Sequence, residues 1–300
     1  MTAESALDPM LKSPLAVGAI GLLMVVGLAA LQRGRGLVRD TTLTAAWGWA
    51  VAAVAAVGGM ELLHWLIGGE PATGTVSLTR YLAALLTLGP AMSVLGAKRP
   101  QHRGWQFIVF SLLVVLALPA AQAAMFRPGA ALVLPPAWAV FLGVLLIVGV
   151  VNHLPSRFGV PSFLSGLGQF ALFTPYQPWW DVPRPELWPA IGLVLIVTAA
   201  VLAVSMPCKP ATSRLPLDRL WLDFRDLVGM AWGLRVAERF NGTARTQGWN
   251  VTLHWHGLAD VSGGQPSLSP EVEQAAQRSL ASLVGLFAAP TWIADRLGET

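Results

Sequence analysis

The sequence predicts an all-α polytopic membrane protein, with about seven transmembrane helices followed by a small, mostly helical C-terminal region in the cytoplasm. Three observations support this fold class. Of the 300 residues, 54% are hydrophobic and only 12% are charged, which is about half the charged fraction of a soluble domain. The mean hydropathy is +0.58. The apolar residues are gathered in runs that approach the ~20 residues needed to cross the hydrocarbon layer of a bilayer.

One hairpin sets the predicted orientation. Two apolar runs, 81–95 and 105–122, flank a short loop that contains Lys98, Arg99 and Arg103. Loops rich in Lys and Arg stay on the cytoplasmic side of a membrane, so this loop is expected to lie inside the cell. Its position then fixes the direction of every other span.

Seven apolar runs are interpreted as spans. The first is expected to be a retained helix, because cations and not a signal-peptide cleavage site follow it. The second is rich in Ala and Gly, which permit close approach of helices. The sixth contains Pro161 and Pro175, and it is either a full span or a re-entrant segment. The predicted spans are 14–31, 42–68, 81–95, 105–122, 135–151, 158–176 and 187–206.

The distribution of cations favours seven spans over six. With seven crossings and the N-terminus outside, Lys12, Arg80, Arg127 and Arg184 lie outside, one in each outer segment, while the inner loops hold clusters. Without the sixth crossing, the cations after the last span would lie outside. The protein is therefore expected to be multi-pass in the plasma (inner) membrane. The cations that set its orientation are Arg33, Arg35, Arg39, Lys98, Arg99 and Arg103.

Residues 207–300 are expected to form the cytoplasmic region. Residues 217–240 have the apolar spacing of an amphipathic helix, which either lies on the inner leaflet or packs on a later helix. Its acidic residues disfavour the leaflet and favour a small domain that rests on the membrane. Residues 251–258 alternate well enough for a short strand. Ser269 and Pro270 begin a helix predicted to reach residue 289.

Glu61 and His64 are the main candidate for chemistry within a span. They are three residues apart and share a face of the second span, and ionisable groups within a membrane are functional candidates. The same spacing occurs in carboxylate-bridged metal sites, but the other spans offer no further carboxylates to complete one. The predicted topology places the pair near the outer end of the helix. There, hydrogen bonding to each other or to interfacial water is the favoured interpretation.

Weaker candidates involve the other histidines. His254 and His256 would point to the same side of a strand, with Asp260 as the nearest carboxylate, and a polar strand surface is a simpler interpretation than a metal site. His64 and His153 fall near opposite faces of the membrane, so they cannot ligate one haem together. No metal, cofactor or catalytic residue is therefore predicted.

Three functions remain open. The favoured one is a non-catalytic accessory or scaffold subunit of a membrane complex, whose C-terminal region meets a protein partner. A small-solute transporter or channel is the first alternative, because glycines and prolines interrupt the third and fourth spans. A haem- or quinone-binding redox protein is the second. The cations beside apolar runs indicate the lipid bilayer as a partner rather than nucleic acid, and no motif typical of an enzyme is found.

Overall fold

The computed structural model describes residues 14–67, 74–206, 216–261 and 268–298. The chain is mostly helical, at 76%, in agreement with the predicted all-α class. Within the described residues, six helices or helix pairs are long and apolar enough to cross a membrane. In chain order the elements are α2 (Pro14–Val38), α3 (Thr44–Leu66), α4 (Gly74–Leu86), α5 (Gly89–Leu95), α6 (His102–Leu116), α7 (Leu118–Phe126), α8 (Pro136–His153), α9 (Gly159–Phe173), the 3₁₀ helix η1 (Thr174–Tyr176), α10 (Trp188–Ser205), α11 (Pro216–Thr246), β1 (Val251–His254), β2 (Gly257–Asp260), α12 (Pro270–Val284) and α13 (Pro290–Leu297).

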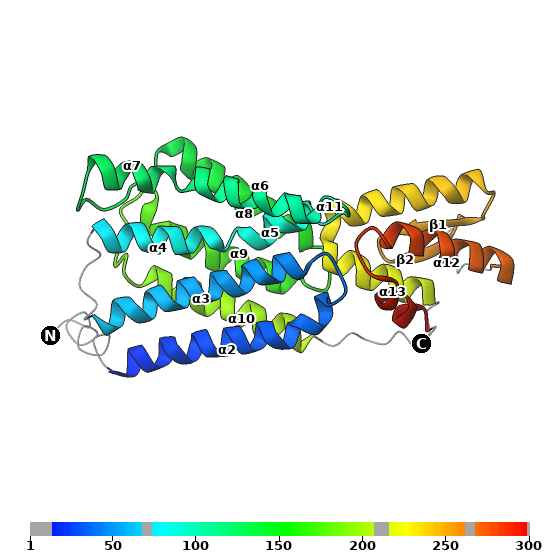
Figure 1. Ribbon diagram of the computed structural model, residues 1–300, viewed down its shortest axis with the longest axis horizontal. Helices are drawn as coiled ribbons and strands as arrows, with labels where there is room; N and C mark the ends of the chain where they lie inside the picture. The colour runs from blue at the N-terminus through cyan, green and yellow to red at the C-terminus, as the bar shows by residue number, and fades with distance from the viewer. Residues whose placement is uncertain (1–13, 68–73, 207–215, 262–267, 299–300) are drawn as a thin grey trace.

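Helices α2 to α10 run along the long axis of the molecule and form a bundle, and the C-terminal elements lie at one end of it (Figure 1). Two of the predicted spans are broken. The third consists of α4 and α5, with Pro90 in the first turn of α5, and the fourth consists of α6 and α7, with Pro119 in the first turn of α7. Proline has no amide hydrogen and its ring crowds the preceding turn, which explains both breaks.

Helix α9 covers the segment whose crossing was in doubt. At 15 residues it is shorter than a usual span, yet its ends lie at opposite ends of the bundle. Just before it, Arg157 pairs with Asp226 of the C-terminal region. Just after it, the carbonyl of Tyr176 accepts a hydrogen bond from the amide of Leu134, beside the first turn of α8. The segment therefore passes along the whole bundle.

Helix α11 is two helices joined at Gly229, where the sequence had predicted one continuous helix. Gly229 has φ 74° and ψ −167°, a conformation that glycine adopts readily and other residues do not. The Asn152 side chain at the end of α8 enters the break. It donates to the carbonyl of Val228 (3.3 Å) and accepts from the amide of Ala231 (2.9 Å). One side chain thus satisfies backbone groups on both sides of the kink.

The C-terminal elements share a hydrophobic core with the end of the bundle. Trp221, Phe224 and Phe287 are buried in the same cluster as Leu43 and Val94 of the bundle. In this arrangement α11 packs within a domain together with α12, α13 and the hairpin.

Two details of the C-terminal prediction are wrong. The single strand expected at 251–258 is the antiparallel hairpin of β1 and β2. The helix expected to continue to residue 289 stops at Val284, and Pro290 begins α13. The predicted start of α12 is confirmed, because the Ser269 hydroxyl accepts a hydrogen bond from the amide of Val272. Hydrogen bonds from its own backbone amide and from Ser269 lower the pKa of Glu271 in this first turn.

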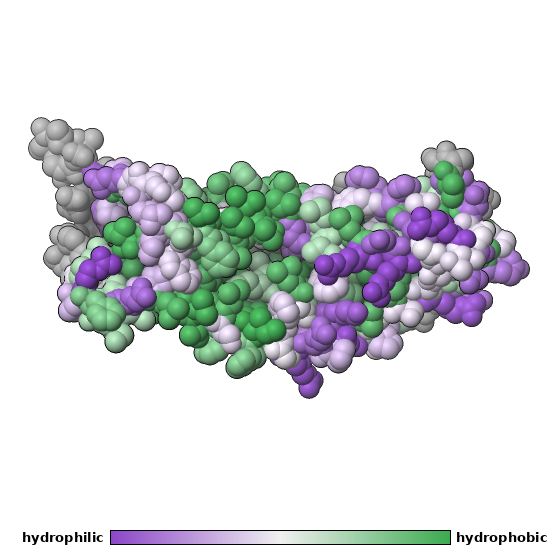
Figure 2. All heavy atoms as spheres, turned by 90° about the horizontal axis from the view of Figure 1, so that it is seen from above, coloured by the Kyte–Doolittle hydropathy of each residue, from purple (hydrophilic) through white to green (hydrophobic). Residues whose placement is uncertain are grey.

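The surface of the bundle is that of a protein surrounded by lipid. Figure 2 shows hydrophobic residues over the bundle, whereas polar residues gather over the C-terminal domain. Large apolar side chains are exposed along α6 and α8, including Phe107, Phe110, Phe141 and Ile147. A water-exposed surface of this kind would be costly, so the bundle is the membrane-embedded part.

We expect Gly229→Ala to destabilise the protein by roughly 2–4 kcal/mol, because alanine is strained at this φ and its Cβ would overlap Asn152. Gly242→Ala is the matched control in the same helix. An added Cβ there meets no atom within 4 Å, so the change should be neutral or stabilise by up to about 1 kcal/mol. Thermal unfolding in detergent measures both, and equal stability of the two variants would contradict the assigned kink.

Candidate functional site

A buried ion pair between α3 and α4 is the main polar feature of the bundle. Arg80 donates from Nε to Oε1 of Glu61 at 2.7 Å and from Nη2 to Oε2 at 2.6 Å. Both side chains are almost fully buried, with 4% of Arg80 and 1% of Glu61 exposed. Each lies five or six residues from the helix end farthest from the C-terminal domain, or about 8–9 Å at 1.5 Å per residue.

The pair corrects two sequence-based predictions. Arg80 is not an exposed cation of an outer segment, because α4 begins at Gly74 and carries Arg80 inside the bundle. The carboxylate of Glu61 binds Arg80 and not His64, although the predicted position near the outer end of the helix is consistent with the structure. A buried pair of this geometry fixes the relative position of its two helices, because either charge left alone in the interior would be strongly unfavourable.

The ion pair borders a small void. Glu61, Arg80 and Tyr176 line it together with apolar side chains of α3, α9 and α10, and its volume is about 10 Å³. This is close to the ~10–15 Å³ that one water molecule requires. The arrangement has room for a water next to the guanidinium group, but not for a solute of several atoms.

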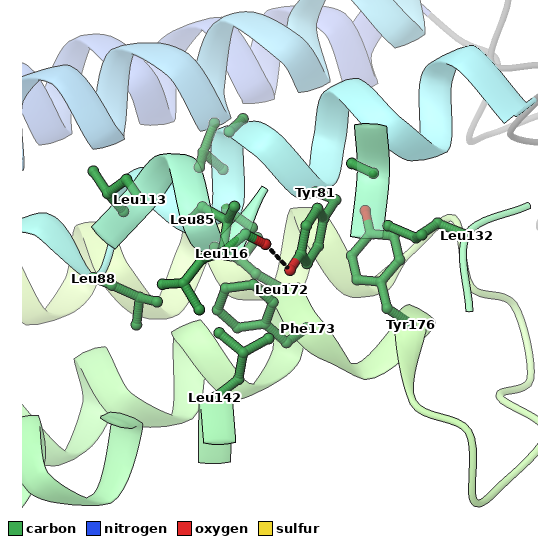
Figure 3. Close-up of a cluster of buried hydrophobic side chains, with 14 of the residues drawn as sticks. Tyr81, Leu85, Leu88, Leu113, Leu116, Leu132, Leu142, Leu172, Phe173 and Tyr176 are labelled. Carbon is green, nitrogen blue, oxygen red and sulfur yellow. Dashed lines mark hydrogen bonds between the residues drawn. The ribbon is translucent and has the colours of Figure 1, made fainter. Parts of the chain in front are cut away.

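The two tyrosines of the chain, Tyr81 and Tyr176, are buried near this ion pair and link neighbouring helices through hydrogen bonds. The hydroxyl of Tyr81 donates to the carbonyl of Leu116 at 2.8 Å, and that of Tyr176 donates to the carbonyl of Ser77 at 3.2 Å. Their rings meet edge to face, with centroids 5.2 Å apart. Figure 3 shows them among buried leucines, with Phe173 packed against Tyr81.

Side chains also satisfy the backbone where the helices break. Leu116 is the last residue of α6, so its carbonyl lies in the turn that lacks helical partners, and Tyr81 supplies the donor. At the other break, Gln169 of α9 donates to the carbonyl of Thr87 at 2.6 Å. These contacts favour the interpretation of the Gly and Pro interruptions as kinks between packed helices, rather than as the lining of a substrate path.

The histidines of the spans lie far apart, as the predicted topology required. His64 is in the last turn of α3, whereas His153 ends α8 against the C-terminal domain, with Nε2 3.4 Å from the carbonyl of Leu227. The Nε2 atom of His64 is buried, and no hydrogen-bond partner for it is found among the described residues. The two rings cannot bind one iron.

The structure does not bring together the three candidates of the C-terminal region, His254, His256 and Asp260. His254 pairs with Gly257 at the closed end of the hairpin and His256 lies in the turn, whereas Asp260 pairs with Val251 at the open end. Three residue steps along a strand separate these ends by about 10 Å. In the part of the chain that the structure describes, no three His, Cys, Asp or Glu side chains form a group suited to a metal ion.

A second notable site is the junction between the bundle and the C-terminal domain. The segment between α12 and α13, residues 285–289, forms backbone hydrogen bonds with two loops of the bundle, and we call it the connector. The amide of Thr42 donates to Phe287 (2.8 Å), that of Arg99 donates to Leu286 (2.8 Å), and that of Ala289 donates to Asp40 (2.7 Å). These bonds hold the α2–α3 and α5–α6 loops to one short stretch of chain.

Side chains reinforce the junction. Arg157, between α8 and α9, forms ion pairs with Asp223 and Asp226 of α11, both at 3.6 Å. The indole of Trp232 donates to the carbonyl of Val94 at 3.0 Å, and that of Trp255 donates to the carbonyl of Pro155 at 2.9 Å. Three separate loops of the bundle are therefore tied to the domain.

All six predicted orienting cations lie at this same end. Arg33, Arg35 and Arg39 are at the end of α2, and Lys98, Arg99 and Arg103 are in or beside the α5–α6 loop. The side chain of Arg35 lies 5.2 Å from the ring centroid of Trp47. The residues that sequence reasoning missed are Arg80 and the connector. A signal for Arg80 was available, since a carboxylate in a span needs a cation and Arg80 directly precedes the third apolar run.

Comparison with protein-family models, with curated proteins and with solved structures finds no match to this chain. The residues and geometry above are therefore the basis for assigning a function. The intramembrane site holds a neutralised ion pair and the junction holds a rigid interface. The first arrangement joins α3 to α4, and the second joins the bundle to the C-terminal domain.

We expect Glu61→Leu or Arg80→Leu alone to destabilise the protein by about 3–5 kcal/mol, because each leaves one buried charge without its partner. The double variant should be much more stable than either single variant, since it removes both charges. Unfolding in detergent, followed by tryptophan fluorescence, measures the four proteins. Additive losses in the double variant would contradict direct coupling of the two side chains.

Proposed function

We propose that the protein is a non-catalytic scaffold or accessory subunit of a membrane complex, which holds its C-terminal domain in a fixed position for a protein partner. In this proposal the bundle crosses the membrane seven times, with α9 as the sixth crossing. The N-terminus lies outside and the C-terminal domain lies in the cytoplasm.

The charge distribution supports this orientation. The end of the bundle that meets the C-terminal domain carries the six orienting cations and Arg157, as expected of a cytoplasmic face. Arg80, predicted from the sequence to be one of the cations of the opposite end, is buried in an ion pair with Glu61. Trp179 and Trp180 are half-exposed near that end, where indole rings favour the interface with water.

The rigid junction is the observation that most supports a scaffold. A domain joined by a flexible linker would be free to turn, whereas this one shares a core with the bundle and is held by the connector, by Asn152 and by Arg157. Such pre-organisation reduces the entropy lost when a partner binds.

The transporter alternative has less support. A transporter would need a path for solute past Glu61. Both carboxylate oxygens of Glu61 accept hydrogen bonds from Nε and Nη2 of Arg80. The adjoining void has room for about one water molecule. Beside the helix breaks, the carbonyls of Thr87 and Leu116 accept hydrogen bonds from Gln169 and Tyr81, so they are not available to a solute.

The second half of α11 offers a surface for a partner. Leu234 is 52% exposed, and Arg235, Glu238 and Arg239 are exposed on neighbouring turns. An apolar residue surrounded by charges of both signs is suited to a polar-rimmed protein interface.

The orientation is testable with fusion reporters. Green fluorescent protein fused after Thr300 should fluoresce, because it folds in the bacterial cytoplasm but not after export in unfolded form. Alkaline phosphatase fused after residue 130, in the α7–α8 loop, should be active, because it requires the periplasm. The reverse pattern would contradict the proposed topology.

The partner is testable by photo-crosslinking in intact membranes. A photoreactive amino acid at Leu234 should give a discrete, heavier adduct that contains a second protein. The matched control is the same amino acid at Ile147, which is exposed on α8 within the bundle and should react with lipid. A monomeric protein without any protein adduct from position 234 would count against the scaffold proposal.

A further inference from the structure

The outward face of α6 combines cations with a stripe of exposed apolar side chains. Arg103, Phe107, Phe110 and Val114 follow one another at intervals of four, three and four residues, which places them within about 60° of each other around the helix. Phe107 is 74% exposed, Phe110 57% and Val114 50%. The opposite face is buried against the bundle through Val109, Leu113 and Leu116.

Among the described residues, the two arginines at the start of this stripe, Arg99 and Arg103, have no acidic partner. The sequence contains no Asp or Glu between Glu70 and Asp181, and among the described residues neither Arg99 nor Arg103 forms an ion pair. The charges of both side chains act on the ring of His102, so both lie near the first residue of α6. An anion would find two uncompensated guanidinium groups there.

The loop that carries Arg99 is held in place. Trp105 occupies the space beside Gly96 where a Cβ would lie, and its indole donates to the carbonyl of Met92 at 2.9 Å. On the other side, the amide of Arg99 donates to Leu286 of the connector. The backbone hydrogen bond leaves the Arg99 side chain available, and the fixed loop lowers the entropic cost of binding.

From these observations we infer that α6 and the α5–α6 loop bind an anionic phospholipid. Its phosphate is held by Arg99 and Arg103 at the membrane boundary, and its acyl chains lie along Phe107, Phe110 and Val114. A diffusing inorganic phosphate would use the cations alone and would leave the apolar stripe unexplained. Because the connector also holds this loop through the amide of Arg99, the lipid and the C-terminal domain act on the same segment.

The test is native mass spectrometry of the full-length protein in detergent, titrated with phosphatidylglycerol or with phosphatidylcholine of the same acyl chains. The wild-type protein should bind phosphatidylglycerol more tightly. Each interfacial cation strengthens anionic lipid binding by about five-fold, so R99Q/R103Q should weaken it by roughly 25-fold. The control R245Q/R278Q removes two exposed cations from α11 and α12 of the C-terminal domain and should leave the affinity unchanged.

Two further arms separate a lipid from a free anion. F107A/F110A should weaken phosphatidylglycerol binding while both cations remain. Glycerol 3-phosphate, which has no acyl chains, should not displace the lipid at equal concentration. Equal affinity for the two lipids, equal loss in the two arginine variants, no effect of F107A/F110A, or displacement by glycerol 3-phosphate would each overturn the inference.

Discussion

The hydrocarbon core of a membrane offers no hydrogen bonds, so the backbone polar groups of the bundle must find their partners within the protein. This constraint explains the contacts around the two broken helices. The helix breaks at each proline, and a side chain from a different helix binds a carbonyl beside the break: Tyr81 of α4 binds that of Leu116, and Gln169 of α9 binds that of Thr87. The breaks therefore join α4, α6 and α9 rather than weakening the bundle. Buried charges face the same requirement, and Glu61 and Arg80 meet it by pairing with each other.

At the end of the bundle that meets the C-terminal domain the constraint is different. Water there can satisfy exposed polar groups, so the arrangement depends mainly on how the apolar side chains pack. The core continues from the bundle into the C-terminal domain, and the kink at Gly229 brings the middle of α11 into contact with the end of α8. The polar contacts that frame this core are mostly to the backbone of loops. Such contacts tolerate changes in loop side chains, which leaves cations such as Arg99 and Arg103 available for the membrane surface.

The sequence was sufficient for the features that depend on local composition. Apolar runs predicted the membrane helices, clustered cations predicted which end of the bundle is basic, and the Ser269–Pro270 pair predicted the start of α12. It was insufficient where a residue's role depends on a distant partner. Arg80 looks like a loop cation until α4 is seen to begin at Gly74. Gly229 lies within an uninterrupted amphipathic pattern, and only its contact with Asn152 explains the break. The connector has no side-chain signature, because its hydrogen bonds come from the backbone.

The connector also has a consequence for how the protein is made. It follows all the membrane helices in the chain, yet it hydrogen-bonds to loops that leave the ribosome much earlier. Until residues 285–289 are synthesised, Thr42, Arg99 and Asp40 have only water as a partner, and the newly inserted helices are not yet locked at this end. Synthesis of residues 285–289 is thus the step after which the α2–α3 and α5–α6 loops can form these backbone hydrogen bonds.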